Sequence, residues 1–335
     1  PHALLEIGSE LAPALAPWKR KTPQVRQTPR GVVGIHQLSL GASVVPTVKV
    51  YAHGVSMGQP GHNSQPPPRG IVKGWTQASI RRNRNFLYSV DVEALKALPG
   101  LGLTFTVRDC PPTALDWSRM REALLEALRR EGFVLVHWVT EWQRRRVPHL
   151  HLAIFLPAGT DPCAFALKAV THWLRIAAAY RPRRQAQFWN PIFDALGWNK
   201  YLSKHAARGL RHYQRSASSL PEGWQGGSAG RMWGKLGEWP LAPVFSLSVS
   251  HQGFAMLRRF LRSWRVADAR RAILKAKGPK ERLGAVRRLR AARRMLLCPD
   301  PYLSAVRGCS EWFGQDLMLR CLDLLASSGC PIESI

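Results

Sequence analysis

Two histidines two residues apart, His149 and His151, are the side chains of this chain that most clearly suggest chemistry. They lie in residues 141–156, EWQRRRVPHLHLAIFL. Because residues two apart in a strand share a face, both imidazoles would point one way and the intervening leucines the other. Two neutral imidazoles with coordination positions left open are suited to a divalent catalytic metal.

A carboxylate is the natural third ligand, and Glu141 is the first candidate. Residues 133–141, FVLVHWVTE, are rich in Val and aromatic residues and are predicted to form a strand. The seven residues between Glu141 and His149 could close an antiparallel hairpin that brings the carboxylate beside the imidazoles. Because this assignment depends on the hairpin register, Asp109 is kept as the reserve candidate. The alternative is that the histidines only pack in a core.

A second candidate for chemistry lies in residues 198–209, WNKYLSKHAARG, where Tyr201 and Lys204 are three residues apart. On a helix this spacing places both side chains on one face. Nearby positive charge favours the phenolate as a nucleophile, and the lysine could neutralise a phosphate under attack. The alternative is an ordinary tyrosine at the edge of an amphipathic helix.

The helix that carries Tyr201 has predicted boundaries. Asn190 is a suitable N-cap, Pro191 suits the first helical position, and Gly209 is typical of a C-terminal stop. His205 and Arg208 would continue the face that Tyr201 begins.

Together these residues resemble the HUH endonucleases, in which a His-hydrophobic-His strand holds a metal and a Tyr-x-x-Lys helix carries the nucleophile. The order, with histidines before tyrosine, resembles rolling-circle replication initiators more than conjugative relaxases. Residues 103–107, LTFTV, look like the family's first strand motif. The wider pattern, from GWTQAS at 74–79 to GRMWGKLGEWP at 230–240, is similar to initiators of filamentous, inovirus-type phages and small plasmids. The resemblance covers roughly residues 70–245.

The resemblance implies an activity. Tyr201 would attack one strand at a replication origin, giving a 5′-phosphotyrosine link and a 3′-OH primer, and the strand would later be rejoined. His149, His151 and Glu141 would hold Mg²⁺ or Mn²⁺. Since Tyr180 and Tyr213 lie far from Tyr201 in the sequence, the chain resembles the single-tyrosine class.

Composition favours a polyanionic partner. The net charge is +28 and the pI is near 11.1, so nucleic acid is the first choice of partner and an anionic membrane surface a distant second. The resemblance implies that the nucleic acid is single-stranded and origin DNA. No G-x-x-x-x-G-K-[ST] sequence occurs, so a host helicase would separate the strands and a host polymerase would extend the primer. No apolar run predicts a membrane span. The six cysteines show no C-x-x-C spacing, which favours the reducing cytoplasm of a bacterial host cell.

The predicted fold is α+β: an antiparallel sheet with helices on one face, of the palm or RRM-like type that the HUH resemblance implies, plus a basic helical C-terminal region. Residues 1–69 are expected to be a poorly ordered Pro/Gly-rich segment with a short strand pair in VVPTVKVYAHGV. Residues 70–245 would form the endonuclease domain and residues 246–335 a basic region for DNA binding or oligomerisation. Within the domain, residues 81–85 could either touch the DNA backbone or form a solvated charged loop. Residues 86–90 are predicted as a strand or loop, 118–131 as a helix capped by Ser118, and 161–179 as another helix.

Arginines are the predicted DNA contacts. Residues 258–294 carry fifteen Lys or Arg against two acidic residues and predict two basic amphipathic helices separated at Gly278-Pro279. The candidates are Arg81, Arg82, Arg84, Arg208, Arg231, Arg258, Arg262, Arg270, Arg271, Arg287 and Arg288. Trp224, Trp233 and Trp239 could stack on unpaired bases, although ordinary packing is favoured.

Two other functions are compatible with the sequence. A plasmid mobilisation relaxase would use the same chemistry on transfer DNA. A non-catalytic basic nucleic-acid-binding protein would need no metal, and its binding would fall steeply with salt. The apolar tail from residue 299 to 335 could cover the basic helices or form a homodimer contact.

Overall fold

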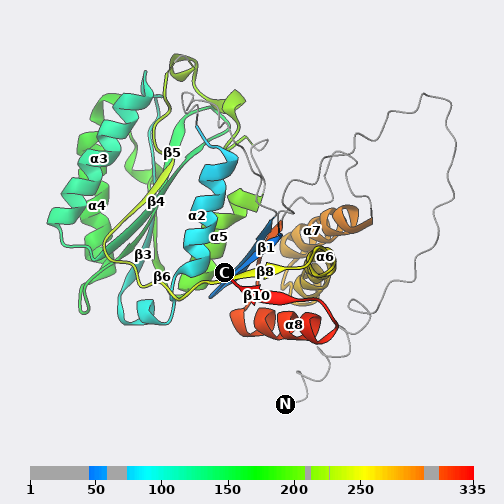
Figure 1. The fold of residues 1–335 in the computed structure, drawn as a ribbon. Helices are drawn as coiled ribbons and strands as arrows, with labels where there is room; N and C mark the ends of the chain where they lie inside the picture. The colour runs from blue at the N-terminus through cyan, green and yellow to red at the C-terminus, as the bar shows by residue number, and fades with distance from the viewer. Residues whose placement is uncertain (1–44, 59–73, 208–212, 226, 298–308) are drawn as a thin grey trace, which may run out of the picture. The chain divides into compact units, whose positions relative to one another are not determined.

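The computed structural model describes residues 45–58, 74–207, 213–225, 227–297 and 309–335; the side chains of 204–207 and 294–297 are not among the groups described. The chain divides into two compact units. Of the described residues, those at 51–54 and between 74 and 244 form the central unit, and those at 45–50, at 55–58 and from 245 onward form the terminal unit. Figure 1 shows both.

The central unit is built on a five-stranded antiparallel sheet with the strand order β6-β3-β5-β4-β7. Its strands are β3 (Gly100–Thr106), β4 (Leu135–Trp142), β5 (Pro148–Phe155), β6 (Phe188–Ile192) and β7 (Trp233–Leu236). β4 and β5 form the hairpin that the sequence predicts, and β3 lies on the other side of β5.

The register of this sheet decides which side chains share a face. Across β4 and β5, Glu141 pairs with His149 and Val139 pairs with His151. Across β3 and β5, Thr106 pairs with His149, and Thr104 with His151. Directly paired residues point to the same side of a sheet, so the two histidines, Glu141 and the two threonines lie on one face, here called the histidine face.

The opposite face is apolar and is covered by α3 (Ala114–Arg130) and α4 (Pro162–Ile176), as Figure 1 shows. Leu150, Leu152 and Ile154 of β5 belong to the core cluster on this side. α4 begins after Asp161, close to the predicted start. α3 begins four residues before the predicted Ser118, because Thr113 and Asp116 form a capping box that the sequence analysis overlooked.

The histidine face is covered by α2 (Gln77–Ser89) and α5 (Ala195–Ala207), which lie together in Figure 1. The α+β class is therefore confirmed, but the prediction of helices on only one face of the sheet was wrong, because β4 is buried along its whole length and both of its faces are covered (Figure 1). The alternative of a loop at 81–85 and the prediction of a strand or loop at 86–90 were wrong, because α2 continues through residues 81–89. The helix is capped by Thr76, whose side chain accepts from the Ser79 N–H.

The predicted start of the helix that carries Tyr201 was also wrong. Asn190 and Pro191 lie in β6, where they pair with Gly102 and Leu101 of β3. A proline is tolerated there because β6 is an edge strand, whose outward N–H groups need no partner. α5 begins after Asp194, whose carboxylate accepts from the Gly197 N–H at 2.9 Å. Helix α5 ends at Ala207, and the predicted stop at Gly209 lies outside the described residues.

The terminal unit contains a second five-stranded sheet, with the order β10-β8-β1-β2-β9. The strands of this sheet are β1 (Thr47–Tyr51), β2 (Gly54–Gly58), β8 (Phe245–Val249), β9 (Cys309–Trp312) and β10 (Ile332–Ser334), and the helices of the unit are α6 (His251–Leu274), α7 (Pro279–Leu297) and α8 (Gln315–Ser327). The central unit also has five short 3-10 turns: η1 (Ala94–Ala97), η2 (Ala178–Tyr180), η3 (Arg184–Ala186), η4 (Ala217–Ser219) and η5 (Glu222–Trp224). The predicted strand pair of the N-terminal segment therefore belongs to this sheet, although the sequence analysis placed it in a poorly ordered lead-in.

The two basic helices predicted from the sequence are α6 and α7. The apolar side of α6, with Phe254, Leu257 and Phe260, shares one core cluster with Met318 and Leu322 of α8. The apolar tail therefore covers α6, which is one of the two roles the sequence left open. None of the helices described here is long and apolar enough to cross a membrane.

One buried histidine of the central unit gives a stability prediction. His137 of β4 is fully buried, contacts the Asn83 Oδ1 atom through Nε2 at 2.8 Å, and has its pKa lowered by burial to about 3. The unfolded chain binds a proton on this residue below about pH 6.5 and the folded chain does not. Stability should fall between about pH 6.5 and pH 3, by about 1.4 kcal/mol per pH unit.

Chemical denaturation at pH 7 and pH 5 measures this effect. We expect the loss of unfolding free energy on acidification to be smaller in His137→Gln than in the wild type. Equal losses in the two proteins would show that His137 does not contribute.

Candidate active site

The centre of the candidate site is the cluster of His149, His151 and Glu141 on the histidine face. The Nε2 atom of His151 lies 3.7 Å from Oε2 of Glu141, and both side chains are almost completely buried. The His149 and His151 rings are 4.5 Å apart, centroid to centroid, in an edge-to-face arrangement. The structure thus brings together the three residues that the sequence analysis singled out, by the hairpin register it expected.

Neighbouring polar side chains contact the Nδ1 atom of each imidazole and so orient both rings. Thr104 Oγ1 is 3.0 Å from Nδ1 of His151, and Gln143 Nε2 is 2.9 Å from Nδ1 of His149. Burial, with a smaller contribution from the positive charge of Arg145, lowers the pKa of His149 to about 4. His149 is therefore neutral at physiological pH, which is the state that a metal ligand requires.

Glu141 has a second contact that sequence reasoning missed. Nε and Nη2 of Arg215 donate to Oε1 of Glu141 at 3.3 and 3.1 Å, and both side chains are buried. The Arg215 guanidinium also stacks over Trp75, 4.2 Å from the ring centroid. Arg215 therefore holds one carboxylate oxygen, while the other faces His151.

Tyr201 lies next to this cluster. Its ring centroid is 6.2 Å from that of His151 and 5.4 Å from that of Trp198, and its side chain is 38% exposed. Trp198 packs directly over Gly102 of β3, where a Cβ atom would approach the indole ring to 2.4 Å. The absence of a side chain at Gly102 thus allows α5 to sit close to the sheet and hold Tyr201 beside His151.

The remaining predicted site residues differ in their placement. Lys204 follows Tyr201 by three residues on α5, but its side chain lies outside the described groups, and Arg208 lies outside them altogether. Asp109, the reserve ligand, pairs with Nε and Nη2 of Arg181 at the end of β3. Of the two candidates for a third ligand, the structure brings only Glu141 to the histidines.

The donor set matches a divalent metal in type. Two imidazoles and a carboxylate suit Mg²⁺, Mn²⁺ or Zn²⁺. Gln143 turns its amide nitrogen toward Nδ1 of His149, because its amide oxygen accepts from Nε of Arg145 at 2.7 Å. Although His149, His151 and Glu141 are neighbours, no three His, Cys, Asp or Glu side chains among the described residues are placed so that they could hold a metal ion together.

Two of the predicted DNA contacts, which are far apart in the sequence, line the same cavity. Arg82 of α2 and Arg231, just before β7, line one cavity of about 430 Å³ together with Lys235. Ser79 and Ser228 add polar groups to it. Arg81 is exposed on α2, and Arg84 is half-buried with its guanidinium 5.9 Å from the centre of the Tyr88 ring.

The other predicted contacts lie on the basic helices of the terminal unit. Arg270, Arg287 and Arg288 are exposed, and Arg258, Arg262 and Arg271 are half-buried. Among these, Arg271 already has a partner within the protein, since its guanidinium stacks over Trp264, 4.4 Å from the ring centroid. The exposed charge of α6 and α7 is available to a polyanion.

The tryptophans near β7 mostly pack. Trp224 and Trp239 are buried, and Trp224 meets Trp142 edge to face with 5.1 Å between the ring centroids. Packing, the interpretation favoured from the sequence, is confirmed for these two. Trp233 is half-buried and packs against Phe86.

Comparisons with known proteins place this site in context. The chain is 43% identical over 298 residues to a putative replication protein of Xylella fastidiosa strain 9a5c, covering 87% of this chain and all of that protein. It is 41% identical over 286 residues to a replication-associated protein of Pseudomonas phage Pf3, covering 84% and 98%. A putative replication protein of Xylella fastidiosa strain Temecula1 is 43% identical over 276 residues, covering 80% and 99%. No family model and no solved structure matches the chain.

Proposed function

This chain belongs to the family of replication proteins that includes the replication-associated protein of Pseudomonas phage Pf3, and from that membership we propose that it is an HUH-type initiator that nicks one strand at a replication origin. The observation that carries the proposal is the position of Tyr201, whose ring lies 6.2 Å from that of His151 at the edge of the buried His149, His151 and Glu141 cluster. A nucleophile that is partly exposed beside such a cluster is accessible to a DNA strand.

In the proposed reaction the Tyr201 phenolate oxygen attacks the scissile phosphorus. A bond forms between that oxygen and phosphorus, the bond from phosphorus to the 3′-oxygen breaks, and the 3′-oxygen leaves and takes up a proton. The products are a 5′-phosphotyrosine and a 3′-OH. Because the phosphodiester is conserved in the tyrosine link, a later 3′-OH can reverse the step and rejoin the strand.

The site residues have distinct proposed roles. His149, His151 and Glu141 would hold Mg²⁺ or Mn²⁺, and Lys204 would neutralise the phosphate from α5. The bound ion would stabilise the charge that builds up on the scissile phosphate in the transition state. Arg215 would keep Glu141 ionised and turned toward His151, since it donates to the other carboxylate oxygen.

The basic surfaces suit the binding of origin DNA, which the proposed function also requires. An initiator binds origin DNA before it cuts, and the charge of +28 favours that association. We propose that the cavity lined by Arg82 and Arg231 and the arginines of α6 and α7 contact the DNA backbone. Host helicase and polymerase would then open the duplex and extend the 3′-OH.

End-labelled DNA tests the proposed bond cleavage. A single-stranded oligonucleotide from the origin region of the parent replicon, labelled at its 5′ or its 3′ end, is incubated with the protein and Mn²⁺ or EDTA. We expect the 3′ label to become protein-linked, because the downstream fragment carries the 5′-phosphate. The 5′ label should appear as a shorter free strand that a polymerase extends, and neither product should form in EDTA.

Each alternative gives a different result. A protein-linked 5′ label would contradict the proposed direction of attack. Tight, salt-sensitive binding with no cleavage in any metal would support the non-catalytic DNA- or RNA-binding protein instead. Cleavage confined to transfer-origin DNA would favour a mobilisation relaxase, although the three relatives described above are all named replication proteins.

A further inference from the structure

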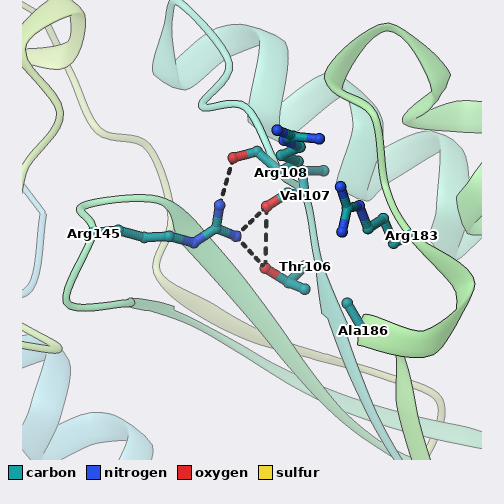
Figure 2. A pocket seen from close by; sticks show the side chains of 6 residues that line it. All are labelled: Thr106, Val107, Arg108, Arg145, Arg183 and Ala186. Atoms are coloured by element: carbon teal, nitrogen blue, oxygen red, sulfur yellow. Dashed lines mark hydrogen bonds between the residues drawn. The ribbon is translucent and has the colours of Figure 1, made fainter.

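A cavity of about 290 Å³ lies at the end of β3 in the central unit, outside the candidate site described above. It is lined by Thr106, Val107, Arg108, Arg145, Arg183 and Ala186 (Figure 2). Three of its six lining residues are arginines and none is acidic. Its volume is near the lower end for small-ligand sites, which suits a phosphodiester group with part of its nucleotide.

Arg145 forms a fixed wall of this cavity. Its guanidinium donates to the backbone carbonyls of Val107 and Arg108, to Thr106 Oγ1 at 3.3 Å, and to Gln143 Oε1 at 2.7 Å. Figure 2 shows it reaching the end of β3 from the hairpin turn, with Arg183 approaching from the other side. Because its N–H groups are used within the protein, Arg145 contributes positive charge and rigidity more than direct contacts.

Arg108 and Arg183 are the groups suited to bind a ligand. Both are exposed, and neither forms an ion pair with another of the described residues. The adjacent acid, Asp109, is occupied by Arg181, and this pairing lowers the pKa of Asp109. Two guanidinium groups that form no ion pair with the described residues, beside a third, are a favourable environment for a phosphate.

The cavity adjoins the candidate site on the histidine face. Thr106 is the direct cross-strand partner of His149 in the β3 and β5 pair. Gln143 also links the two places, since it accepts from Arg145 and contacts His149 Nδ1 at 2.9 Å. A DNA strand whose scissile phosphate lies at His149 and Tyr201 would therefore carry a neighbouring phosphate close to this cavity.

We infer that the cavity is a phosphate subsite, in which Arg108 and Arg183 bind a backbone phosphate of the single strand next to the scissile one. This inference rests on the proposed function, because it takes single-stranded DNA to be the substrate. The subsite would fix the register of the strand on the histidine face, with Arg145 holding the end of β3 in place.

Binding without catalysis tests the subsite. The full chain and the variant Arg108→Gln/Arg183→Gln are titrated in EDTA with an oligodeoxythymidylate of about 12 nucleotides, at several salt concentrations. A matched control, Arg119→Gln/Arg175→Gln, removes the same charge from exposed positions on α3 and α4, on the opposite face of the sheet. Circular dichroism confirms that all three proteins are folded.

Loss of one phosphate contact should make the slope of log K against log salt shallower by about 0.7 in the cavity variant. The control variant should keep a slope close to that of the wild type. Equal slopes in the two variants would overturn the subsite. Since no cleavage is involved, a wild type that fails to nick DNA would count against the proposed function and leave this result standing.

Discussion

Replacing Tyr201 by phenylalanine should abolish the covalent protein–DNA product and slow metal-dependent nicking by about 10³-fold or more. The change removes only the oxygen that would bond to phosphorus, and water at the same position lacks the orientation that α5 imposes. The ring, which lies beside His151 and Trp198, is retained. Because the side chain is 38% exposed, the unfolding free energy should change by less than about 0.5 kcal/mol.

The measurement is a denaturing gel of labelled origin-region DNA with Mn²⁺, with unfolding curves recorded in parallel. Tyr213→Phe is the matched control, because Tyr213 is another tyrosine of the central unit, near Arg144. The control should form the covalent product at the wild-type rate. Undiminished product in Tyr201→Phe would place the nucleophile elsewhere in the chain.

The sequence predicts the centre of this site well because its geometry is local. The period of a strand puts His149 and His151 on one face, and a short hairpin with alternating residues allows few registers, so Glu141 falls opposite His149. The α+β class follows from the same alternation and from the apolar stripes of α3 and α4. The metal and the catalytic roles stay predictions, because they depend on atoms that periodicity does not describe.

The wrong predictions of secondary structure have another cause, which is the influence of residues distant in the sequence. Residues 188–192 form a strand only because β3 offers them an unpaired edge, and that edge also tolerates Pro191. Residues 81–85 look like a charged loop in isolation, yet they form a turn of α2 whose buried side, including Asn83 and Phe86, packs on the sheet. In both segments tertiary pairing overrides the local signal.

Arg215 could not be predicted for a related reason. It lies 74 residues from Glu141 in the sequence, in a segment without regular periodicity. Sequence reasoning ranks a lone arginine in a basic protein as one more DNA contact. A buried carboxylate does require a partner, so Glu141 itself indicates that some cation should be nearby, but not which of the 49 Lys and Arg residues supplies it.

Replacing Arg215 by methionine should lower the unfolding free energy by about 3–5 kcal/mol, because it removes one member of a buried ion pair and leaves the other in place. The stacking of the guanidinium on Trp75 would be lost as well. Chemical denaturation followed by tryptophan fluorescence measures the effect. Arg129→Met is the matched control: its pair with Glu126 is exposed to solvent, so the loss of stability should be much smaller than in Arg215→Met.

A double variant separates the ion pair from simple packing. If the cost of Arg215→Met is the buried charge of Glu141, then Glu141→Gln/Arg215→Met, which removes that charge, should recover part of the lost stability. If the cost is lost packing alone, the double variant should be at least as unstable as Arg215→Met. Recovery of stability without recovery of nicking would then show that Arg215 and Glu141 contribute to the chemistry at His151 separately from their contribution to the fold.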